Sequence, residues 1–238
     1  MSTKHKDRNM KKYQIATIAG DGIGPEVTDA TVKVLETALG RDKLHFEMLP
    51  GGAAHYQRSG EVLPQDTFSA CRDLDAILHG AAGLPDVTYP DGTEVGNELH
   101  LQLRFRLDLY ANVRPVKLLP GVASPLRAFP KGGIDYVIIR ENTEGLYASR
   151  NAGVVLRDEV ATDTLMVTRK GTERVARFAM DLSRKRSGAP CDGKRRVTVC
   201  DKANILRSYA FFRNICNEVA VEYADVEIDY AYADAITF

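Results

Sequence analysis

The chain has 238 residues, enough for one large or two small domains, and its 44% hydrophobic and 27% charged residues are typical of a soluble globular protein. Its 32 basic and 32 acidic residues cancel, which argues against a protein that binds nucleic acid or an anionic membrane through overall charge. No apolar run is long enough to span a bilayer.

The four cysteines show neither a CxxC pair nor the spacing of metal ligands. They are therefore predicted to be reduced thiols of a cytoplasmic protein. Residues 1–12 are polar and basic without an apolar centre, which excludes a secretory signal. This segment is predicted to be a disordered leader.

The first half of the chain alternates β-branched, apolar segments with segments of helical spacing, a pattern typical of an α/β sheet. The predicted strands cover residues 13–19, 44–49 and 75–80, and the predicted helices cover residues 27–40, 64–74 and 97–109. Residues 81–96 are rich in Gly and Pro and are predicted to form a long loop. Loops of this length in a compact domain are often functional.

The second half changes character near Leu118, where glycines and prolines punctuate the connection. The Val- and Thr-rich residues 154–168 are predicted to form an extended arm, and residues 171–186 an amphipathic helix. A further helix is predicted at 206–219, and strands are predicted before Arg114 and at 134–140, 196–200 and 226–230.

The first predicted strand leads into the glycine-rich turn GDGIGPE, and a helix follows. The dinucleotide-binding pattern G-x-G-x-x-G needs a sixth-position glycine where this chain has Pro25, so that reading fails. Phosphate binding by main-chain N–H groups at the start of the helix remains open. The candidate cofactor-binding residues at this turn are Gly22, Ile23 and Gly24.

Arginines gather around the segment LRFRLDLYANVRP, which contains Arg104 and Arg114, and Arg140 ends the strand-like run IDYVIIR. A guanidinium group matches a carboxylate with two parallel hydrogen bonds and stays charged at any working pH. Converging arginines would hold a substrate with more than one carboxylate. For any one of them taken alone, an exposed and solvated side chain is the ordinary alternative.

Five motifs in this order resemble one family, the β-decarboxylating dehydrogenases, which include isocitrate, 3-isopropylmalate, tartrate and D-malate dehydrogenases. The motifs are GDGIGPE, LRFRLDLYANVRP, IIRENTEGLY, DKAN and the terminal DA. The resemblance implies an α/β, two-domain isopropylmalate-dehydrogenase-like fold, distinct from the Rossmann fold and truncated here at its C-terminus. Residues 13–117 would belong to the larger cofactor and substrate domain, and residues 118–238 to a smaller dimerisation domain with the arm.

The resemblance also implies roles for particular residues. Arg104, Arg114 and Arg140 match the arginines that grip the malate carboxylates, and Tyr147 and Lys202 match the catalytic pair. Asp234 matches a metal-binding aspartate. The implied cofactors are NAD or NADP with Mg²⁺ or Mn²⁺, and the implied assembly is a homodimer with shared active sites. Without the resemblance, Tyr147 reads as a half-buried strand residue and Lys202 as an exposed turn residue.

The expected chemistry is the oxidative decarboxylation of a (2R)-2-hydroxy diacid. A lysine of lowered pKa can remove the hydroxyl proton while hydride leaves for the nicotinamide, and a tyrosine can return a proton after CO₂ is lost. A metal would stabilise the negative oxygen in between.

The chain departs from the family in two ways. It ends where the family continues, so only Asp234 can be carried over as a metal ligand, and the chain is expected to be a fragment or a truncated product. At the substrate-selecting positions, His100 and Leu101 fit neither the isopropylmalate nor the isocitrate members. His100 and Leu101 lie four and three residues before Arg104, so a helix would place all three on one face.

An imidazole on that face favours a D-malate, tartrate or isocitrate-like acid over 3-isopropylmalate. In the competing reading His100 turns away, and Leu101 with Leu99 forms an apolar wall. Two alternatives of another kind stay open: a non-catalytic regulatory subunit and a non-functional truncated product.

Overall fold

The computed structural model describes residues 11–124, 126–128, 132–150 and 152–236. Their contacts divide the chain into two compact units, unit 1 up to Leu107 and unit 2 from Asp108. No helix in the described part of the chain is both long and apolar enough to cross a membrane. The four cysteines are free thiols, as predicted.

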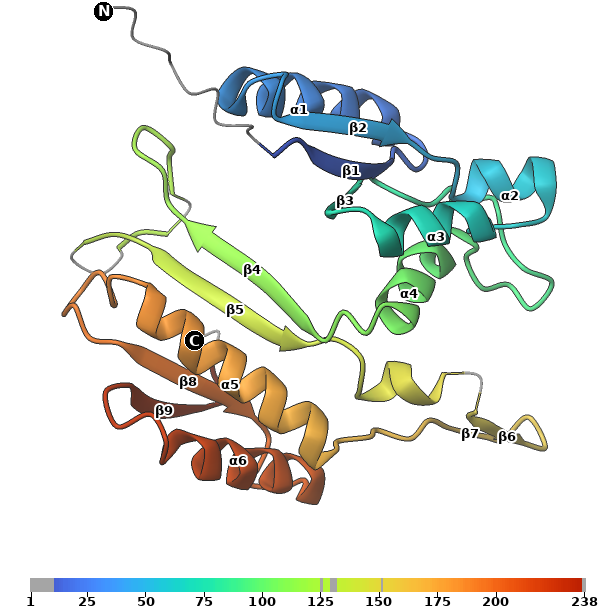
Figure 1. Ribbon diagram of the computed structural model, residues 1–238. Helices are drawn as coiled ribbons and strands as arrows, with labels where there is room; N and C mark the ends of the chain where they lie inside the picture. The colour runs from blue at the N-terminus through green and yellow to red at the C-terminus, as the bar shows by residue number, and fades with distance from the viewer. Residues whose placement is uncertain (1–10, 125, 129–131, 151, 237–238) are drawn as a thin grey trace, which may run out of the picture. The chain divides into compact units, whose positions relative to one another are not determined.

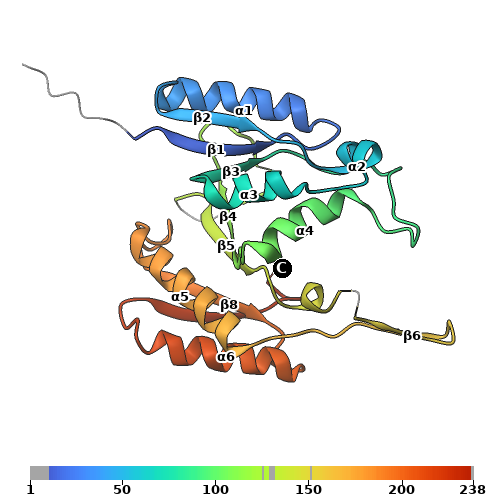
Figure 2. The same ribbon diagram turned by 45° about the vertical axis from the view of Figure 1, so that its right-hand side comes forward.

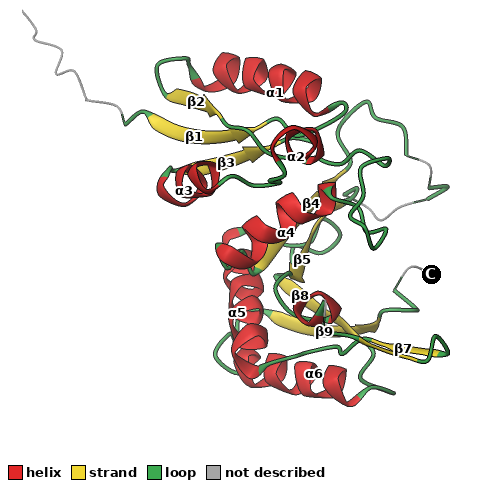
Figure 3. Cartoon of the chain, turned by 90° about the vertical axis from the view of Figure 1, so that its right-hand side faces the viewer, coloured by secondary structure: helices red, strands yellow, loops and turns green. Residues whose placement is uncertain are grey.

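Unit 1 is built on a three-stranded parallel sheet in the order β2-β1-β3 (Figure 1). Its strands are β1 (Tyr13–Ile18), β2 (Leu44–Met48) and β3 (Ala76–His79). Its helices are α1 (Gly24–Leu39), α2 (Ala53–Ser59), α3 (Gln65–Asp73) and α4 (Gly96–Arg106). Figure 3 shows α1 on one face of the sheet and α3 on the other, so both faces are covered.

The core of unit 1 lies between the sheet and the helices that cover it. β1 contributes Ala16 and Ile18, and α4 with its preceding residue contributes Val95, Leu99 and Leu103, all at most 4% exposed. The three α4 positions recur every four residues and therefore form one apolar stripe. This packing fixes the orientation of α4 relative to the sheet of unit 1.

Unit 2 contains three separate two-stranded sheets among the described residues, and α5 and α6 pack against two of them (Figure 2). The antiparallel pair is β4 (Ala111–Lys117) with β5 (Asp135–Glu141), and the parallel pair is β8 (Arg196–Asp201) with β9 (Glu227–Tyr232). The helices are α5 (Arg169–Lys185), α6 (Arg207–Ala220) and the short 3₁₀ helix η1 (Leu146–Ser149). Buried residues of α5, β8 and α6, with Tyr223 and Val226 of the connection before β9, form the second core.

The predicted arm is a small antiparallel hairpin of β6 (Val154–Leu156) and β7 (Val160–Thr162). Arg157 and Asp158 at its tip have positive φ, as the tight turns of β-hairpins require. All six strand residues are exposed, and Figure 2 shows the hairpin extending away from the helices of its own unit. Part of the predicted arm thus forms a hairpin, and its role as a dimerisation arm stays a prediction.

Most predicted elements are present, with three corrections. The predicted helix 97–109 ends at Arg106, because Asp108 has φ 50° and a right-handed helix cannot continue through it. The contacts divide the chain at Leu107 and not at 117, because β4 pairs along its whole length with β5 of unit 2. The short helix α2 was not predicted at all.

The leader prediction concerns mainly residues 1–10, which lie outside the described residues. Lys11 is described, and its ammonium group lies 2.5 Å from Asp75 at the start of β3. The end of that segment is therefore attached to the sheet of unit 1.

Candidate active site

Two of the predicted substrate arginines share one face of the β4–β5 sheet. Arg140 stands directly opposite Asn112, and Arg114 is two residues from Asn112 on the same strand. Side chains two residues apart on a strand point to the same side, as do directly paired residues. The Nε of Arg114 donates to Asn112 Oδ1 at 3.1 Å, which confirms the shared face. The sheet thus presents two guanidinium groups on one side.

Tyr147 is held near Arg140 by the turn that follows β5. Its ring centre lies 5.6 Å from the Arg140 guanidinium carbon, and the side chain is 48% exposed. A cation over an aromatic face is attracted by the ring quadrupole. Tyr147 lies in η1 and not in a strand, so the alternative reading of a half-buried strand residue is wrong.

The acidic residues of the ENTEG motif build this turn. Glu141 accepts hydrogen bonds from the main-chain N–H groups of Thr143 (3.0 Å) and Glu144 (2.6 Å). Glu144 in turn accepts from the N–H of Thr168 at 2.9 Å and from its hydroxyl, which joins the turn to the start of α5. Gly171 leaves room for this contact, since a Cβ there would lie 2.2 Å from the Glu144 carboxylate. Glu141 and Glu144 were missed by the sequence reasoning as positioning residues.

Lys202 follows β8 directly, and Asp234 follows β9. Their charged groups lie 2.6 Å apart, although 63% of the Asp234 side chain is exposed. The hydrogen bond from Lys202 lowers the pKa of Asp234 below its usual value. The structure therefore brings together the predicted base and the predicted metal ligand, and in this conformation each neutralises the other.

A buried ion pair fixes the main chain beside Lys202. Asp201 is 0% exposed, and Arg213 of α6 donates to both of its carboxylate oxygens, at 2.8 and 2.7 Å. Asp201 also accepts the N–H of Ala203 at 2.8 Å, so the residues on both sides of Lys202 are held. The Arg213 guanidinium lies 4.9 Å from the ring centre of Tyr230 and 5.2 Å from that of Tyr232. Bidentate, charge-assisted bonds are the strongest of their kind.

In unit 1 the glycine turn is organised by Asp21, which sequence reasoning did not single out. Asp21 is 3% exposed and accepts the N–H groups of Ala53, Ala54 and Gly83 at 2.8 to 2.9 Å. These bonds hold the start of α2 and the loop after β3 against the turn. Gly52 must be a glycine here, because its φ is 109° and a Cβ would lie 2.6 Å from Asp21.

The three candidate cofactor residues of this turn differ in what they can contact. The N–H of Gly24 donates to the Asp21 carbonyl, and Gly24 is buried, so it shapes the turn. Ile23 is 66% exposed, and no atom lies within 4 Å of the place where a Gly22 Cβ would be. An open main chain at a helix start suits the close approach of a phosphate group. Gly22 and Ile23 therefore leave room for a phosphate group, whereas the N–H of Gly24 is used within the turn. The cofactor-binding role of all three residues stays a prediction.

The helix α4 carries the remaining predicted substrate residues. Leu101 is 7% exposed, while His100 and Arg104 are only partly buried. Leu99 is fully buried in the core of unit 1, and Leu101 is buried as well. The apolar-wall reading, like the reading of a polar pocket at His100, stays a prediction.

The described residues do not form a complete metal site. No cluster of three or more His, Cys, Asp or Glu side chains suited to a metal occurs among them. Mg²⁺ demands near-octahedral oxygen coordination, and Asp234 supplies one carboxylate toward it. Asp201 cannot serve as a second ligand while both of its oxygens bind Arg213.

Comparison with known proteins gives a consistent result. A sequence model described as isocitrate/isopropylmalate dehydrogenase matches residues 14–238. A 3-isopropylmalate dehydrogenase of Clavibacter sepedonicus is 40% identical over 231 residues, covering 94% of this chain and 62% of that protein. A probable tartrate dehydrogenase/decarboxylase of Agrobacterium vitis is 39% identical over 234 residues, covering 96% and 63%. This chain thus spans less than two thirds of the length of these relatives.

Solved structures agree with the sequence comparisons. Isocitrate dehydrogenase from Methylococcus capsulatus matches with a TM-score of 0.77 and 34% identity, covering 94% of this chain and 61% of that one. A β-decarboxylating dehydrogenase from Thermococcus kodakarensis matches with a TM-score of 0.71 and 36% identity, covering 94% and 59%.

Proposed function

The chain belongs to the isocitrate/isopropylmalate dehydrogenase family, and from this premise we propose that it is the larger part of an enzyme that oxidatively decarboxylates a (2R)-2-hydroxy diacid. The proposed reaction depends on NAD or NADP and on Mg²⁺ or Mn²⁺. The single observation that carries the proposal is the arrangement in unit 2. There, two arginines share a face of the β4–β5 sheet, a tyrosine lies against one of them, and a lysine directly follows β8 of another sheet.

In this proposal Arg114 and Arg140 bind the carboxylates of the substrate. The face they share carries two guanidinium groups, and a dicarboxylate offers one carboxylate as acceptor for each. Arg104 of unit 1 is proposed as the third carboxylate ligand on the strength of the family motif. The nicotinamide cofactor accepts the hydride, and Gly22 and Ile23 are proposed to contact its phosphates.

Lys202 is proposed to take the proton of the substrate hydroxyl, and Tyr147 to give a proton to the carbon that loses CO₂. A base must be neutral to accept a proton, so the Lys202–Asp234 contact at 2.6 Å has to open first. Asp234 is free to bind a cation only after that change. The other cation ligands are proposed to lie in the part of the family fold outside these 238 residues.

The roles of the two catalytic residues are tested in the complete protein with Lys202→Met and Tyr147→Phe. We expect Lys202→Met to slow hydride transfer by about 10²- to 10⁴-fold, the usual contribution of a positioned base, with cofactor affinity near wild type. Tyr147→Phe is expected to slow mainly the step that follows CO₂ loss. Pre-steady-state absorbance of the reduced cofactor separates the two steps.

Lys185→Met is a matched control, because Lys185 is an exposed residue at the end of α5. It should leave turnover unchanged. Wild-type turnover in both Lys202→Met and Tyr147→Phe would refute the assignment of the catalytic pair.

For the substrate, we propose a D-malate, tartrate or isocitrate-like acid over 3-isopropylmalate. His100 is partly buried on the same helical face as Arg104 by its spacing. An isopropyl group packed against an imidazole loses part of the free energy of apolar burial, which is about 1.5 to 3 kcal/mol for such a group. A polar substituent has no such loss. The complete protein should be assayed for kcat/KM with each acid and with Mn²⁺. A tenfold preference for 3-isopropylmalate, about 1.4 kcal/mol, would contradict this choice.

The arm is proposed to join two subunits of a homodimer with shared active sites. The protein is proposed to lie in the cytoplasm. Val154, Val155, Leu156 and Val160 are between 49% and 67% exposed, and such a row of apolar side chains marks an interaction surface. Light scattering of the complete protein at micromolar concentration should report a dimer. A Val155→Lys variant should report a larger monomer fraction, and a monomeric wild-type protein would argue against the arm's role.

A further inference from the structure

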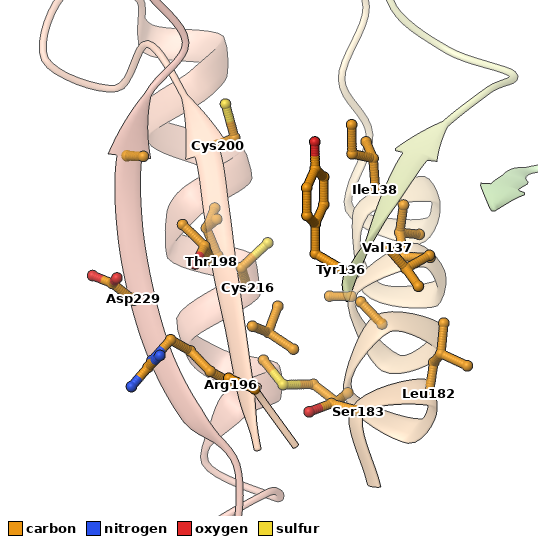
Figure 4. Close-up of a pocket in the computed structure, with 18 of the residues that line it drawn as sticks. Tyr136, Val137, Ile138, Leu182, Ser183, Arg196, Thr198, Cys200, Cys216 and Asp229 are labelled. Atoms are coloured by element: carbon orange, nitrogen blue, oxygen red, sulfur yellow. The ribbon is translucent and has the colours of Figure 1, made fainter. Parts of the chain in front are cut away.

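Two tyrosines of β9 lie on one face of the β8–β9 sheet. Tyr230 and Tyr232 are two residues apart on the strand, and Tyr232 pairs in register with the buried Asp201 of β8. A pocket lies between the edges of β5 and β8, which are unpaired among the described residues (Figure 4). Asp229 and Ala231 of β9 line this pocket, and the two tyrosines do not. The two rings therefore lie outside the pocket, on the side of the sheet where α6 packs.

Both tyrosines contact Arg213 of α6, but they differ in their second contact. The guanidinium carbon of Arg213 lies 4.9 Å from the ring centre of Tyr230 and 5.2 Å from that of Tyr232. The Tyr230 hydroxyl donates to Asn217 Oδ1 at 2.8 Å, which ties this ring to α6. The second contact of the Tyr232 ring is Lys202, whose Nζ lies 5.6 Å from the ring centre. Cations at such distances are attracted by an aromatic face.

The Arg213 guanidinium is fixed by the fold. It donates to both carboxylate oxygens of Asp201 at 2.8 and 2.7 Å, and Asp201 is 0% exposed. If Arg213 moved away, it would leave a buried charge without a partner. The Tyr232 ring thus lies against one cation whose position is fixed, and a second cation, on Lys202, lies over the same ring.

Lys202 itself has less to hold it. Its ammonium group lies 2.6 Å from the carboxylate of Asp234, which is 63% exposed. The proposed reaction requires this ion pair to open. A lysine has a flexible four-carbon stem, so the amine would then have no defined position unless a second contact restrains it. The ring of Tyr232 supplies such a contact.

We propose that Tyr232 is a positioning residue, which holds the side chain of Lys202 at the end of β8 when the ion pair with Asp234 opens. This inference rests on the proposed function, because it assumes that Lys202 acts on the substrate. The contact needs the aromatic ring of Tyr232 and not its hydroxyl group. A phenylalanine should therefore replace Tyr232, whereas a leucine, which has no aromatic face, should not.

The contact is tested first in the 238-residue chain, without any turnover. Reductive methylation with carbon-13 formaldehyde converts each lysine amine into a labelled dimethylamine that keeps its positive charge. The Lys202 methyl resonance is identified by its loss in Lys202→Arg. We expect the Tyr232 ring current to shift this resonance upfield, Tyr232→Phe to keep the shift and Tyr232→Leu to abolish it. Asp234→Asn removes the ion pair and should retain the upfield shift.

The effect on the reaction is tested in the complete protein. Tyr232→Leu should lower kcat about fivefold, the upper range for a cation–π contact at an exposed site. The KM for the diacid should stay within about twofold of wild type, because the proposed carboxylate ligands Arg114 and Arg140 lie on the β4–β5 sheet. Tyr232→Phe should retain the wild-type kcat.

Tyr230→Leu is the matched control. It removes the same kind of contact with Arg213, and the hydrogen bond to Asn217 as well, but it leaves the contact between Tyr232 and Lys202 in place. Its kcat should stay close to wild type, even if urea unfolding shows that it is the less stable variant. A role of Tyr232 in stability alone would instead lower kcat at least as much in Tyr230→Leu.

The proposal is overturned if the Lys202 methyl resonance is the same in the wild-type chain and in Tyr232→Leu. It is also overturned if the two leucine variants lose the same fraction of kcat. A complete wild-type protein that turns over none of the diacids would refute the proposed function instead. The methyl resonance would still decide whether Tyr232 holds Lys202.

Discussion

Both units bury an aspartate close to the carboxyl end of a strand, but the two aspartates are satisfied in different ways. Asp21 of unit 1 accepts three main-chain N–H groups. Asp201 of unit 2 accepts two bonds from the Arg213 guanidinium and one from the N–H of Ala203. One aspartate organises the backbone of a turn, and the other joins a helix to the loop that carries Lys202.

The difference predicts how strongly a mutation would affect each arrangement. Main-chain donors are fixed by the fold, so the geometry around Asp21 is rigid as long as the surrounding loops are in place. The Arg213 side chain can be removed by mutation and would leave a buried charge behind. Breaking one partner of a buried ion pair costs more than losing a neutral hydrogen bond, because the remaining charge has no compensation. Unit 2 should therefore be the more sensitive of the two to a single substitution.

The largest effect is expected from Arg213→Ala. It leaves the fully buried Asp201 without its cation and should lower the free energy of unfolding of unit 2 by about 3 kcal/mol, the low end for buried pairs because Arg213 is 22% exposed. Urea unfolding followed by hydrogen exchange in β8 measures it. The double variant Asp201→Asn with Arg213→Met removes both charges and should recover part of the loss. A single variant as stable as wild type would show that the ion pair is dispensable.

The effect of Asp21→Asn should be smaller. The amide keeps one acceptor oxygen but turns an NH₂ group toward at least one of the three main-chain donors, which costs about 1 to 3 kcal/mol. Exchange of the Ala53, Ala54 and Gly83 amides should accelerate, while β8 is unaffected. Asp29→Asn, on the exposed side of α1, is the control. It should change the amide exchange rates of neither the Asp21 partners nor β8.

Two buried thiols can report on the units separately. Cys71 lies in the core of unit 1, and Cys216 lies in the core of unit 2. Burial raises the pKa of both thiols, that of Cys216 to about 12, so neither should react with iodoacetamide near pH 8 in the folded state, whereas exposed Cys191 should react at once.

Arg213→Ala should accelerate alkylation of Cys216 by up to about 150-fold, the factor that corresponds to about 3 kcal/mol, and leave Cys71 unchanged. Asp21→Asn should accelerate alkylation of Cys71 by a smaller factor and leave Cys216 unchanged. Equal acceleration of both thiols in either variant would show that the two units unfold together, and the comparison of separate units would then be wrong.

The smallest effect concerns the ion pairs that join α5 to α6 and to the turn that follows it. Arg169, Arg177 and Arg184 pair with Glu218, Glu222 and Asp225, and the arginine hydrogen bonds lower the pKa of all three carboxyl groups. A carboxyl group whose pKa is lowered in the folded state stabilises the fold at pH values above its pKa in the unfolded chain. This stabilisation is lost as the pH falls through its pKa in the folded state. Unit 2 should therefore lose a little stability below about pH 4, the ordinary range of these groups.

Because these pairs are exposed, the loss should be small and should shrink in 1 M salt. Urea unfolding followed by circular dichroism at pH 3.5 and pH 7, with and without salt, measures it. A pH effect that persists unchanged at high salt would point to another group.

The sequence by itself determined the alternation of strands and helices and the family. Apolar periodicity is local, so β1, α1, α3, β5, α5, β8 and α6 were predicted close to their observed bounds. The five motifs led to the family that the comparisons confirm over residues 14–238. Tyr147, Lys202 and the arginines could be named because motif residues keep their order along the chain. Their joint role as a site is still a prediction.

Only the tertiary structure decided which of these side chains meet. Lys202 and Asp234 are 32 residues apart in sequence, and no local pattern indicates that their charges lie 2.6 Å apart. The contacts of Asp21, Asp201 and Glu144 join segments distant in sequence, where composition and periodicity carry no signal. The pocket lined by β5 and β8 is of the same kind. An unpaired edge is a property of how strands are arranged in space, and the strand's own residues are the same whether or not a neighbour is present.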